Sequence, residues 1–312
     1  MGDLTLVWIR LILGRALGKQ LLEAGIDDLY IKGLRRPFLQ HVALKLVLYD
    51  WGLKRGIYYG KKIGEEYGIS FLSGKGMEMS TESPHPQGEK FPFQAPTFPL
   101  FVIDLSLWDR HSQDEKRKLV NQILMVISTL RKYLWDYNLS LNHTTQEFEE
   151  MLRDVAFFNK VRRNAEPVNA IVLDPYAEKE ATEEILKSAS TFILGGIVDD
   201  SGWKYATREM AGIAGYHQTR VKITLRGSRV GVPDRLNRII SIVLRVREGQ
   251  SLEDSILEEQ SNADKFARLL RDTTLNGDLE GNAQWLRAGE KLKERVKKII
   301  SRTRPGSSSS LR

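Results

Sequence analysis

The sequence predicts an α/β protein whose central domain is a parallel sheet covered by helices. Three observations carry this prediction. Five short apolar segments alternate with five helical segments through the middle of the chain, a proline-rich stretch precedes them, and only helical patterns follow them. We therefore expect a small α+β domain over residues 1–81, a linker over 82–99, the α/β domain over 100–248, a helical domain over 249–304 and a disordered tail over 305–312.

The N-terminal part combines an apolar start with short strand-like runs. Residues 4–13 are too few to span a bilayer, and Arg10 interrupts them. Because Asp3 stands where a signal peptide carries basic residues, we interpret this segment as a core helix of a cytoplasmic protein. The runs that follow combine one helical stretch, 41–50, with glycine-bounded, strand-like segments at 28–31, 56–60 and 67–74.

The linker is indicated by its prolines. Five of them fall in one short stretch, namely Pro84, Pro86, Pro92, Pro96 and Pro99. Proline fixes the backbone angle φ and has no N–H to donate, so this spacing breaks both helix and sheet. We expect an extended connection.

The central region alternates strand and helix. The expected strands cover residues 101–104, 137–141, 170–173, 192–194 and 221–225, and the helices after them cover 119–134, 146–158, 178–187, 203–211 and 234–247. Such alternation is typical of parallel strands joined by crossover helices. Two more helices are expected to end the chain. Ser251 and Asp254 cap the first, and the last places Leu292, Val296, Ile299 and Ile300 on one face and lysines and arginines on the rest.

Composition narrows the possible functions. The chain of 312 residues has a net charge of +7, no cysteine and only five histidines. Disulfides, thiolate metal sites and a cysteine nucleophile are excluded, and a zinc site is improbable. A basic balance favours an anionic partner, but it is also compatible with an ordinary solvated surface.

The strand ends are the first place to look for a ligand, because open parallel sheets bind ligands at the carboxyl ends of their strands. Three of the expected strands end in the segments 173–175, 194–199 and 225–234. Gly195 and Gly196 let a ligand approach the backbone, or they form a tight turn. Gly227 and Gly231 carry the same two interpretations. On adjacent loops, these glycines together favour a pocket with walls made largely of backbone.

Acidic residues at the same strand ends have structural and functional interpretations. Asp199 precedes an expected helix and can serve as its N-cap or as a reactive carboxylate. Asp104 and Asp174 are likewise typical of caps and turns. The sequence has no phosphate-cradling P-loop, no complete G-x-G-x-x-G and no evident Ser-His-Asp constellation.

Basic residues cluster around the α/β region. Each cluster taken alone is typical of a solvated face, but together they favour a phosphate-binding surface. The residues are Lys116, Arg117, Lys118, Arg131, Lys132, Lys160, Arg162 and Arg163.

Several of these segments resemble one known family. The glycine-pair run 191–199 and the loop 226–237 are similar to segments of the tRNA ninth-purine N1-methyltransferases, which belong to the SPOUT class. The stretches 101–106, 131–136 and 171–176 fit the archaeal branch. The resemblance covers nearly the whole chain, and in combination the motifs are specific.

The resemblance implies a fold and a cofactor that composition does not reveal. SPOUT sheets are threaded into a trefoil knot, a rare exception to un-knotted topology. The implied cofactor is S-adenosylmethionine, the implied partner is tRNA, and neither a metal nor a membrane is expected. The family is expected to act as a monomer. By position, the cofactor site would be lined by Leu173, Leu194, Gly195, Gly196, Leu225, Gly227, Gly231 and Val232.

The implied reaction moves a methyl group to N1 of the purine at tRNA position 9. Asp199 matches the family's candidate carboxylate, either as a general base for guanine or as a stabiliser of positive charge on adenine. The sequence does not reveal which purine is preferred. Eukaryotic members have an Asn-Gln pair where this chain has Val232-Pro233-Asp234, so no side-chain role carries over to Asp234 or Asn237. An inactive RNA-binding protein and a methyltransferase of ribosomal RNA stay open as alternatives.

Overall fold

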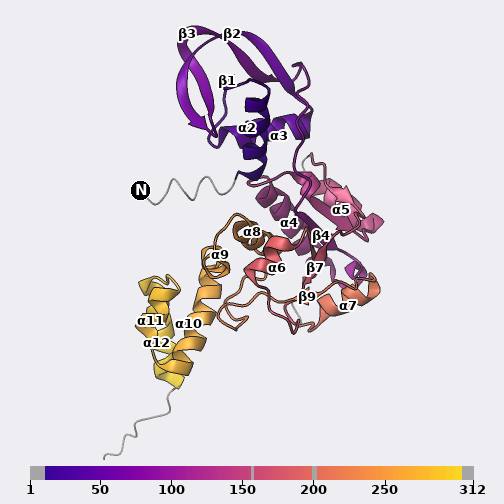
Figure 1. Cartoon of the computed structure of the whole chain (residues 1–312). Helices are drawn as coiled ribbons and strands as arrows, with labels where there is room; N and C mark the ends of the chain where they lie inside the picture. Colours follow the sequence, from indigo (N-terminus) through magenta and orange to yellow (C-terminus); the bar gives the residue numbers. More distant parts are fainter. Residues whose placement is uncertain (1–10, 156–157, 199–201, 304–312) are drawn as a thin grey trace, which may run out of the picture.

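The computed structural model describes residues 11–155, 158–198 and 202–303, and it has three parts (Figure 1). A small α+β domain precedes a central α/β domain, and a bundle of helices follows. The predicted helix at the apolar start, the predicted tail and Asp199 lie largely or wholly outside the described residues.

The N-terminal domain packs two helices against a three-stranded sheet. The helices are α2 (Ile12–Glu23) and α3 (Phe38–Tyr49), and the strands are β1 (Asp28–Tyr30), β2 (Gly52–Glu66) and β3 (Ile69–His85). The sheet has the order β1-β3-β2, with β2 and β3 forming a long antiparallel hairpin. Its core is a separate cluster that includes Leu13, Leu39 and Phe71.

Two contacts account for where helix α3 begins and where strand β3 ends. The carboxylate of Glu66 accepts hydrogen bonds from the backbone N–H groups of Phe38 and Leu39, both at 2.9 Å, so a negative charge sits at the start of α3. Strand β3 runs four residues into the predicted linker, with Pro84 paired to Leu53. A proline is tolerated there because the strand ends at the next residue.

The central sheet has six strands in the order β6-β5-β4-β8-β7-β9, and every pairing is parallel. The strands are β4 (Leu100–Asp104), β5 (Leu139–Asn142), β6 (Arg162–Arg163), β7 (Ala170–Leu173), β8 (Thr191–Gly195) and β9 (Arg220–Val221). The predicted parallel α/β class is confirmed. Strand β6 was not predicted, since two residues are too short to show a pattern, and β9 is shorter than the predicted 221–225.

Helices cover both faces of this sheet. They are α4 (Gln113–Leu130), α5 (Gln146–Val155), α6 (Glu183–Ser188), α7 (Ala206–Ile213) and α8 (Leu236–Arg247). On β4, Phe101 and Ile103 join the cluster beneath α4 and α8, while Leu100 and Val102 join the cluster beneath α7. Burial on both faces explains why the strands read as continuous apolar runs. Two short 3-10 helices, η1 (Trp108–Arg110) and η2 (Asp136–Asn138), complete the domain.

The C-terminal part contains four helices instead of the two that the sequence suggested. They are α9 (Leu252–Glu259), α10 (Asn262–Asn276), α11 (Leu279–Trp285) and α12 (Glu290–Thr303). Side chains of Ser251, Ser261 and Asp278 cap the first three, and Gly277 ends α10 in the left-handed region. On the predicted apolar face of the last helix, Leu292 and Val296 are buried, whereas Ile299 is exposed.

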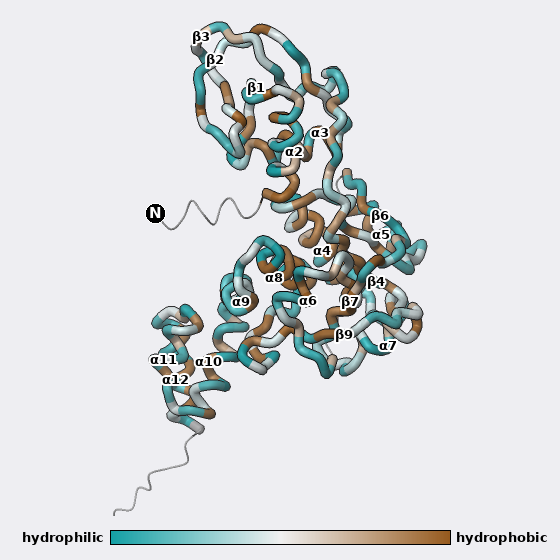
Figure 2. The backbone as a smooth tube through the Cα atoms, viewed as in Figure 1, coloured by the Kyte–Doolittle hydropathy of each residue, from teal (hydrophilic) through white to brown (hydrophobic). Residues whose placement is uncertain are grey.

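The side chain of Gln40 is one of several that connect the N-terminal and central domains. The buried amide of Gln40 accepts from the N–H of Gly14 at 2.9 Å and donates to the carbonyls of Arg131 and Leu134, both at 3.0 Å. Figure 2 shows hydrophobic residues concentrated in the helices and strands of the central domain. No helix in the described part of the chain is both long and apolar enough to span a membrane. The threading of the sheet into a knot stays a prediction.

Candidate functional site

A cavity of about 810 Å³ lies at the carboxyl ends of three neighbouring strands. Its walls include Leu173 from β7, Leu194 and Gly195 from β8, and Val221 from β9. Helix α4, the loop 229–235 and the first turns of α7 and α8 contribute further walls. This is the place where parallel sheets bind ligands, and the volume falls in the range usual for a cofactor or small molecule.

Four of the eight predicted cofactor residues line this cavity, namely Leu173, Leu194, Gly195 and Val232. The other four, Gly196, Leu225, Gly227 and Gly231, are not among its lining residues.

The structure gives another reason for Gly196. A Cβ atom there would lie 2.5 Å from Cδ2 of Leu105 and 2.9 Å from the carbonyl oxygen of Asp104. Its N–H also donates to that carbonyl, at 2.7 Å. Gly196 is therefore small because β4 packs against it. By contrast, a Cβ at Gly195 would meet the flexible end of Ile197, which itself lines the cavity.

One wall of the cavity comes from α4, which sequence reasoning did not assign to the cofactor. The residues are Lys118, Asn121, Gln122 and Met125. They recur at i, i+3, i+4 and i+7, so they occupy one face of the helix. A mainly polar stripe at this spacing, next to the buried stripe of Leu119 and Ile123, is the signal that could have found them.

Aromatic and cationic side chains gather at another part of the cavity. Arg229 lies over the ring of Tyr176, with 4.0 Å between its guanidinium carbon and the ring centroid. Tyr176 also contacts Tyr205, with ring centroids 4.9 Å apart. Arg229 and Tyr176 both line the cavity, so it has a cationic and aromatic border in addition to its apolar walls.

Asp174 lines the same cavity, but both of its carboxylate oxygens are engaged in contacts within the protein. One carboxylate oxygen accepts the N–H of Tyr176 at 2.8 Å, and the other lies 3.3 Å from a guanidinium nitrogen of Arg220. The bond to Tyr176 is the Asx-turn contact that a turn residue makes.

The loop that follows β8 is held by a buried histidine. The N–H of Val198 donates to Nε2 of His111 at 3.1 Å, which requires that this nitrogen carry no proton. Nδ1 then donates to the carbonyl of Leu107 at 3.1 Å. Val198 lines the cavity and directly precedes Asp199, which lies outside the described residues.

A second polar group stands at the carboxyl ends of β4 and β5. The side chain of Asp104 is fully buried, and one of its oxygens accepts from Nδ1 of His143 at 2.6 Å and from the hydroxyl of Tyr216 at 2.8 Å. Its other oxygen accepts from the N–H of Ser106 at 2.9 Å. Burial, reinforced by the nearby Asp104 carboxylate, raises the pKa of Tyr216, so its hydroxyl stays a donor.

Most of the predicted RNA-binding residues form contacts within the protein. Arg131 pairs with Asp136, Arg163 with Glu149, Lys160 with Asp50, Lys116 with Glu147 and Arg117 with Asp114. Arg162 donates to the carbonyls of Tyr137 and Thr97. Lys118 lines the cavity, and Lys132 is exposed. An RNA role for this set stays a prediction.

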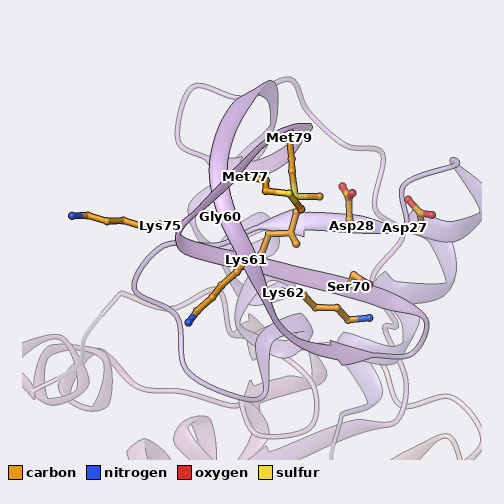
Figure 3. A pocket seen from close by; sticks show the side chains of 11 residues that line it. Asp27, Asp28, Gly60, Lys61, Lys62, Ser70, Lys75, Met77 and Met79 are labelled. Carbon is orange, nitrogen blue, oxygen red and sulfur yellow. The ribbon is translucent and has the colours of Figure 1, made fainter.

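A second cavity, of about 520 Å³, lies against the β2–β3 hairpin of the N-terminal domain. Figure 3 shows the side chains of Lys61, Lys62 and Lys75 pointing in different directions, apart from Asp27 and Asp28. Because its charged groups do not converge, this cavity offers no organised binding site. In the residues that the structure describes, no group of three or more histidine or acidic side chains could hold a metal ion.

Comparison with known proteins places this architecture among characterised relatives. Residues 11–85 match the family model described as the tRNA (adenine(9)-N1)-methyltransferase N-terminal domain, and residues 261–299 match the model of the C-terminal domain. A tRNA (adenine(9)-N1)-methyltransferase from Sulfolobus acidocaldarius is 39% identical over 294 residues, which are 93% of this chain and 99% of the relative.

Two further comparisons agree. A tRNA (guanine(9)-/adenine(9)-N1)-methyltransferase from Thermococcus kodakarensis is 36% identical over 180 residues, which are 53% of this chain and 48% of the relative. The crystal structure of Sulfolobus acidocaldarius Trm10 in complex with S-adenosylhomocysteine superposes with a TM-score of 0.80 at 36% identity. That match covers 93% of this chain and 99% of that structure.

Proposed function

Since this chain belongs to the family of tRNA (adenine(9)-N1)-methyltransferases, we propose that the cavity at the ends of β7, β8 and β9 is where it binds S-adenosylmethionine. The protein is an S-adenosylmethionine-dependent tRNA methyltransferase of the SPOUT class, and it acts on N1 of the purine at position 9. The single observation that carries the site assignment is the cavity at the strand ends.

The residues around the cavity fit this ligand. S-adenosylmethionine has an adenine ring, which packs against apolar walls, and it has polar groups in its ribose and its amino-acid end, which need hydrogen-bonding partners. Leu173, Leu194 and Val232 supply apolar surface. Asn121 and Gln122 supply amide groups from α4, and the strand ends supply backbone groups. When bound, the ligand provides an electrophilic methyl group.

The protein's own contribution is to orient the two reactants and to exclude water. The N1 atom lies on the Watson–Crick edge, so the purine must leave the tRNA core before it reaches the cavity. Holding N1 at attack distance in a dry site supplies much of the rate. We propose that Tyr176 and Arg229 contact the incoming nucleotide by stacking and by charge.

We propose Asp199 as the carboxylate nearest the reacting base. Two facts support this: its place directly after Val198, a cavity residue, and its match to the family's candidate carboxylate. A carboxylate there stabilises the positive charge that builds up on adenine, or it helps guanine lose its N1 proton. We further propose that the protein acts as a monomer and that Lys118 and Lys132 contact tRNA phosphates.

The test is to map the modified nucleotide. Two tRNA transcripts that differ only in A or G at position 9 are incubated with labelled S-adenosylmethionine, digested and analysed by mass spectrometry. We expect N1-methylpurine at position 9 of at least one transcript. A protein that binds both transcripts without transferring a methyl group would be an inactive RNA-binding protein, and labelling confined to ribosomal RNA would reassign the substrate.

A further inference from the structure

We infer that His143 accepts the proton that the target purine loses, and that Asp104 and Tyr216 position its imidazole for this step. This inference rests on the proposed function and adds a second reactive group to the site. It is carried by the juxtaposition of a fully buried carboxylate, a partly buried hydroxyl and a half-exposed imidazole, 47% accessible, at the carboxyl edge of the sheet.

The strand pairings show how far the imidazole of His143 lies from the cavity. Asn142 on β5 pairs with Asp104 on β4, which pairs with Gly195 on β8, a wall of the cavity. His143 therefore follows a strand two spacings from that wall, roughly 10 Å away. The ends of the strands are joined laterally, since Gly196 donates to the carbonyl of Asp104 at 2.7 Å and Leu105 donates to that of Asn142 at 2.9 Å.

The side chain of Asp104 lies on the face of the sheet that α7 covers. Val102 and Ile193 belong to the cluster beneath α7, and Asp104 and Gly195 lie two residues further along the same strands. Side chains alternate across a sheet, so Asp104 and Gly195 share that face. Ile197 and Trp203 pack against the same cluster and line the cavity. The cavity also has walls on the other face, from Leu173, Leu194 and α4, so it lies across the strand ends and reaches the face on which Asp104 lies. We place the extruded purine between this part of the cavity and the imidazole.

The protein fixes the imidazole firmly. His143 has a left-handed backbone with φ of 55°, which is uncommon for non-glycine residues although histidine adopts it more readily than most. Its N–H donates to the side chain of Asn164 at 2.9 Å, and its Nδ1 donates to Asp104. Within the described residues no hydrogen bond engages Nε2, the nitrogen that is left for a ligand. Strain of this kind is retained where surrounding structure enforces it, often at functional sites.

The methyl transfer releases a proton that His143 can accept. A methyl transfer breaks the sulfur–methyl bond, leaves its electron pair on sulfur to give S-adenosylhomocysteine, and forms the N1–methyl bond. Guanine gives up its N1 proton for this, and methylated adenine gives up a proton from its exocyclic amine. Nε2 of His143 accepts that proton directly or through one water, and the half-exposed ring returns it to solvent. Asp104 holds the other nitrogen as the donor and stabilises the imidazolium that forms. In this assignment Asp199 stabilises the positive charge that builds up on the base, and His143 accepts the proton.

The experiment compares two substitutions at position 143. His143→Asn suits a left-handed backbone and can still donate to Asp104, but it has no nitrogen that titrates. His143→Gly also suits that backbone and leaves room for free imidazole. His217→Asn, a change of the exposed histidine beside Tyr216, is the matched control. Single-turnover rates at saturating S-adenosylmethionine and tRNA are measured from about pH 5 to pH 9, together with S-adenosylhomocysteine and tRNA affinities.

On the transcript with G at position 9, we expect His143→Asn to slow the single turnover about a hundredfold or more and to abolish the fall in rate at acidic pH, with both affinities within about twofold of the wild type. On the transcript with A the effect should be smaller, because adenine N1 carries no proton that must leave before the methyl group is transferred. Added imidazole should restore the rate of His143→Gly in proportion to its unprotonated fraction. Asp104 and Tyr216 are the titratable side chains in contact with the ring. Tyr216→Phe should therefore move the acid limb to higher pH, because the carboxylate loses a donor and holds the imidazolium more strongly.

Three outcomes would overturn the inference. An unchanged rate for His143→Asn at every pH would leave the histidine without a part in the reaction. Weaker tRNA binding with a normal rate at saturation would make it a phosphate contact. A slow His143→Gly that imidazole does not restore would make it a structural residue. None of these touches the proposed function, whose test is the mapping of the methylated nucleotide in the wild-type protein.

Discussion

The guanidinium of Arg131 donates two hydrogen bonds to the carboxylate of Asp136, both 2.7 Å long. The aspartate side chain is fully buried, and the arginine is 17% exposed. The same guanidinium also donates to the carbonyl of Phe158 at 2.9 Å. From the sequence alone, Arg131 and Lys132 formed one basic cluster for RNA, but the structure gives the two neighbours different environments.

We predict that Arg131→Met lowers the free energy of unfolding by about 3 kcal/mol, because it leaves a buried carboxylate without its partner. The exposed neighbour provides the control, since Lys132→Met should change stability by less than about 0.5 kcal/mol. Urea denaturation of both variants measures the difference. Equal stability of the two variants would show that the buried pair contributes nothing to folding.

Lys132→Met should instead affect RNA binding. If the proposed phosphate contact exists, the slope of log affinity for tRNA against log salt becomes shallower by somewhat less than one. Binding titrations between about 50 and 200 mM salt measure this slope. An unchanged slope would return Lys132 to the solvated surface.

The contrast between these neighbours shows what a sequence can and cannot predict. The parallel sheet was predictable because each strand is an apolar run buried on both faces, as β4 and β8 are. The strand-end position of the site followed from the same reasoning. Partners such as Asp136 for Arg131, or His143 for Asp104, depend on tertiary contacts between residues that no local pattern relates. Residue type alone therefore could not separate structural from functional charges.

The two neighbouring glycines at the end of β8 should also differ in role, Gly196 in packing and Gly195 in the cavity wall. We predict that Gly196→Ala destabilises the fold by about 1 to 3 kcal/mol, because its Cβ would meet a backbone oxygen of β4 that cannot move freely. Gly195→Ala should be better tolerated, because its Cβ would clash with the end of the flexible Ile197 side chain and would otherwise lie at an ordinary contact distance from Thr207. Displacing Ile197 into the cavity should weaken cofactor binding about tenfold, or roughly 1.4 kcal/mol. Thermal melts and calorimetric titration of both variants test this; the reverse ranking would contradict the cavity assignment.

Glu147 makes stability depend on pH at the acid end. Hydrogen bonds from the Lys116 ammonium, then from Gln113 and the Trp108 indole, lower the pKa of Glu147 from 4.5 to about 2. A carboxyl whose pKa is lowered by folding stabilises the protein above its unfolded pKa and loses that effect as the pH falls through the folded value. The melting temperature of Glu147→Gln should therefore lie below that of the wild type at pH 7, and the gap should close between about pH 4.5 and pH 2. A gap that stays constant down to pH 2 would contradict this.

The last prediction concerns Asp199. The sequence suggested that it caps the following helix, but α7 begins at Ala206 and its N-cap is Tyr205, so Asp199 is not the cap of that helix. Asp199→Asn should leave the rate unchanged if the carboxylate has no part in the reaction. If the carboxylate stabilises positive charge at N1, we expect a rate about tenfold or more below the wild type on the tRNA with A at position 9. The fall in rate at acidic pH should remain, because His143 accepts the proton in our assignment. Single-turnover rates across a pH series, on transcripts with A or G at position 9, separate the cases. A loss of the acid limb in Asp199→Asn, with severe loss on the guanine transcript, would make Asp199 the general base and remove that role from His143.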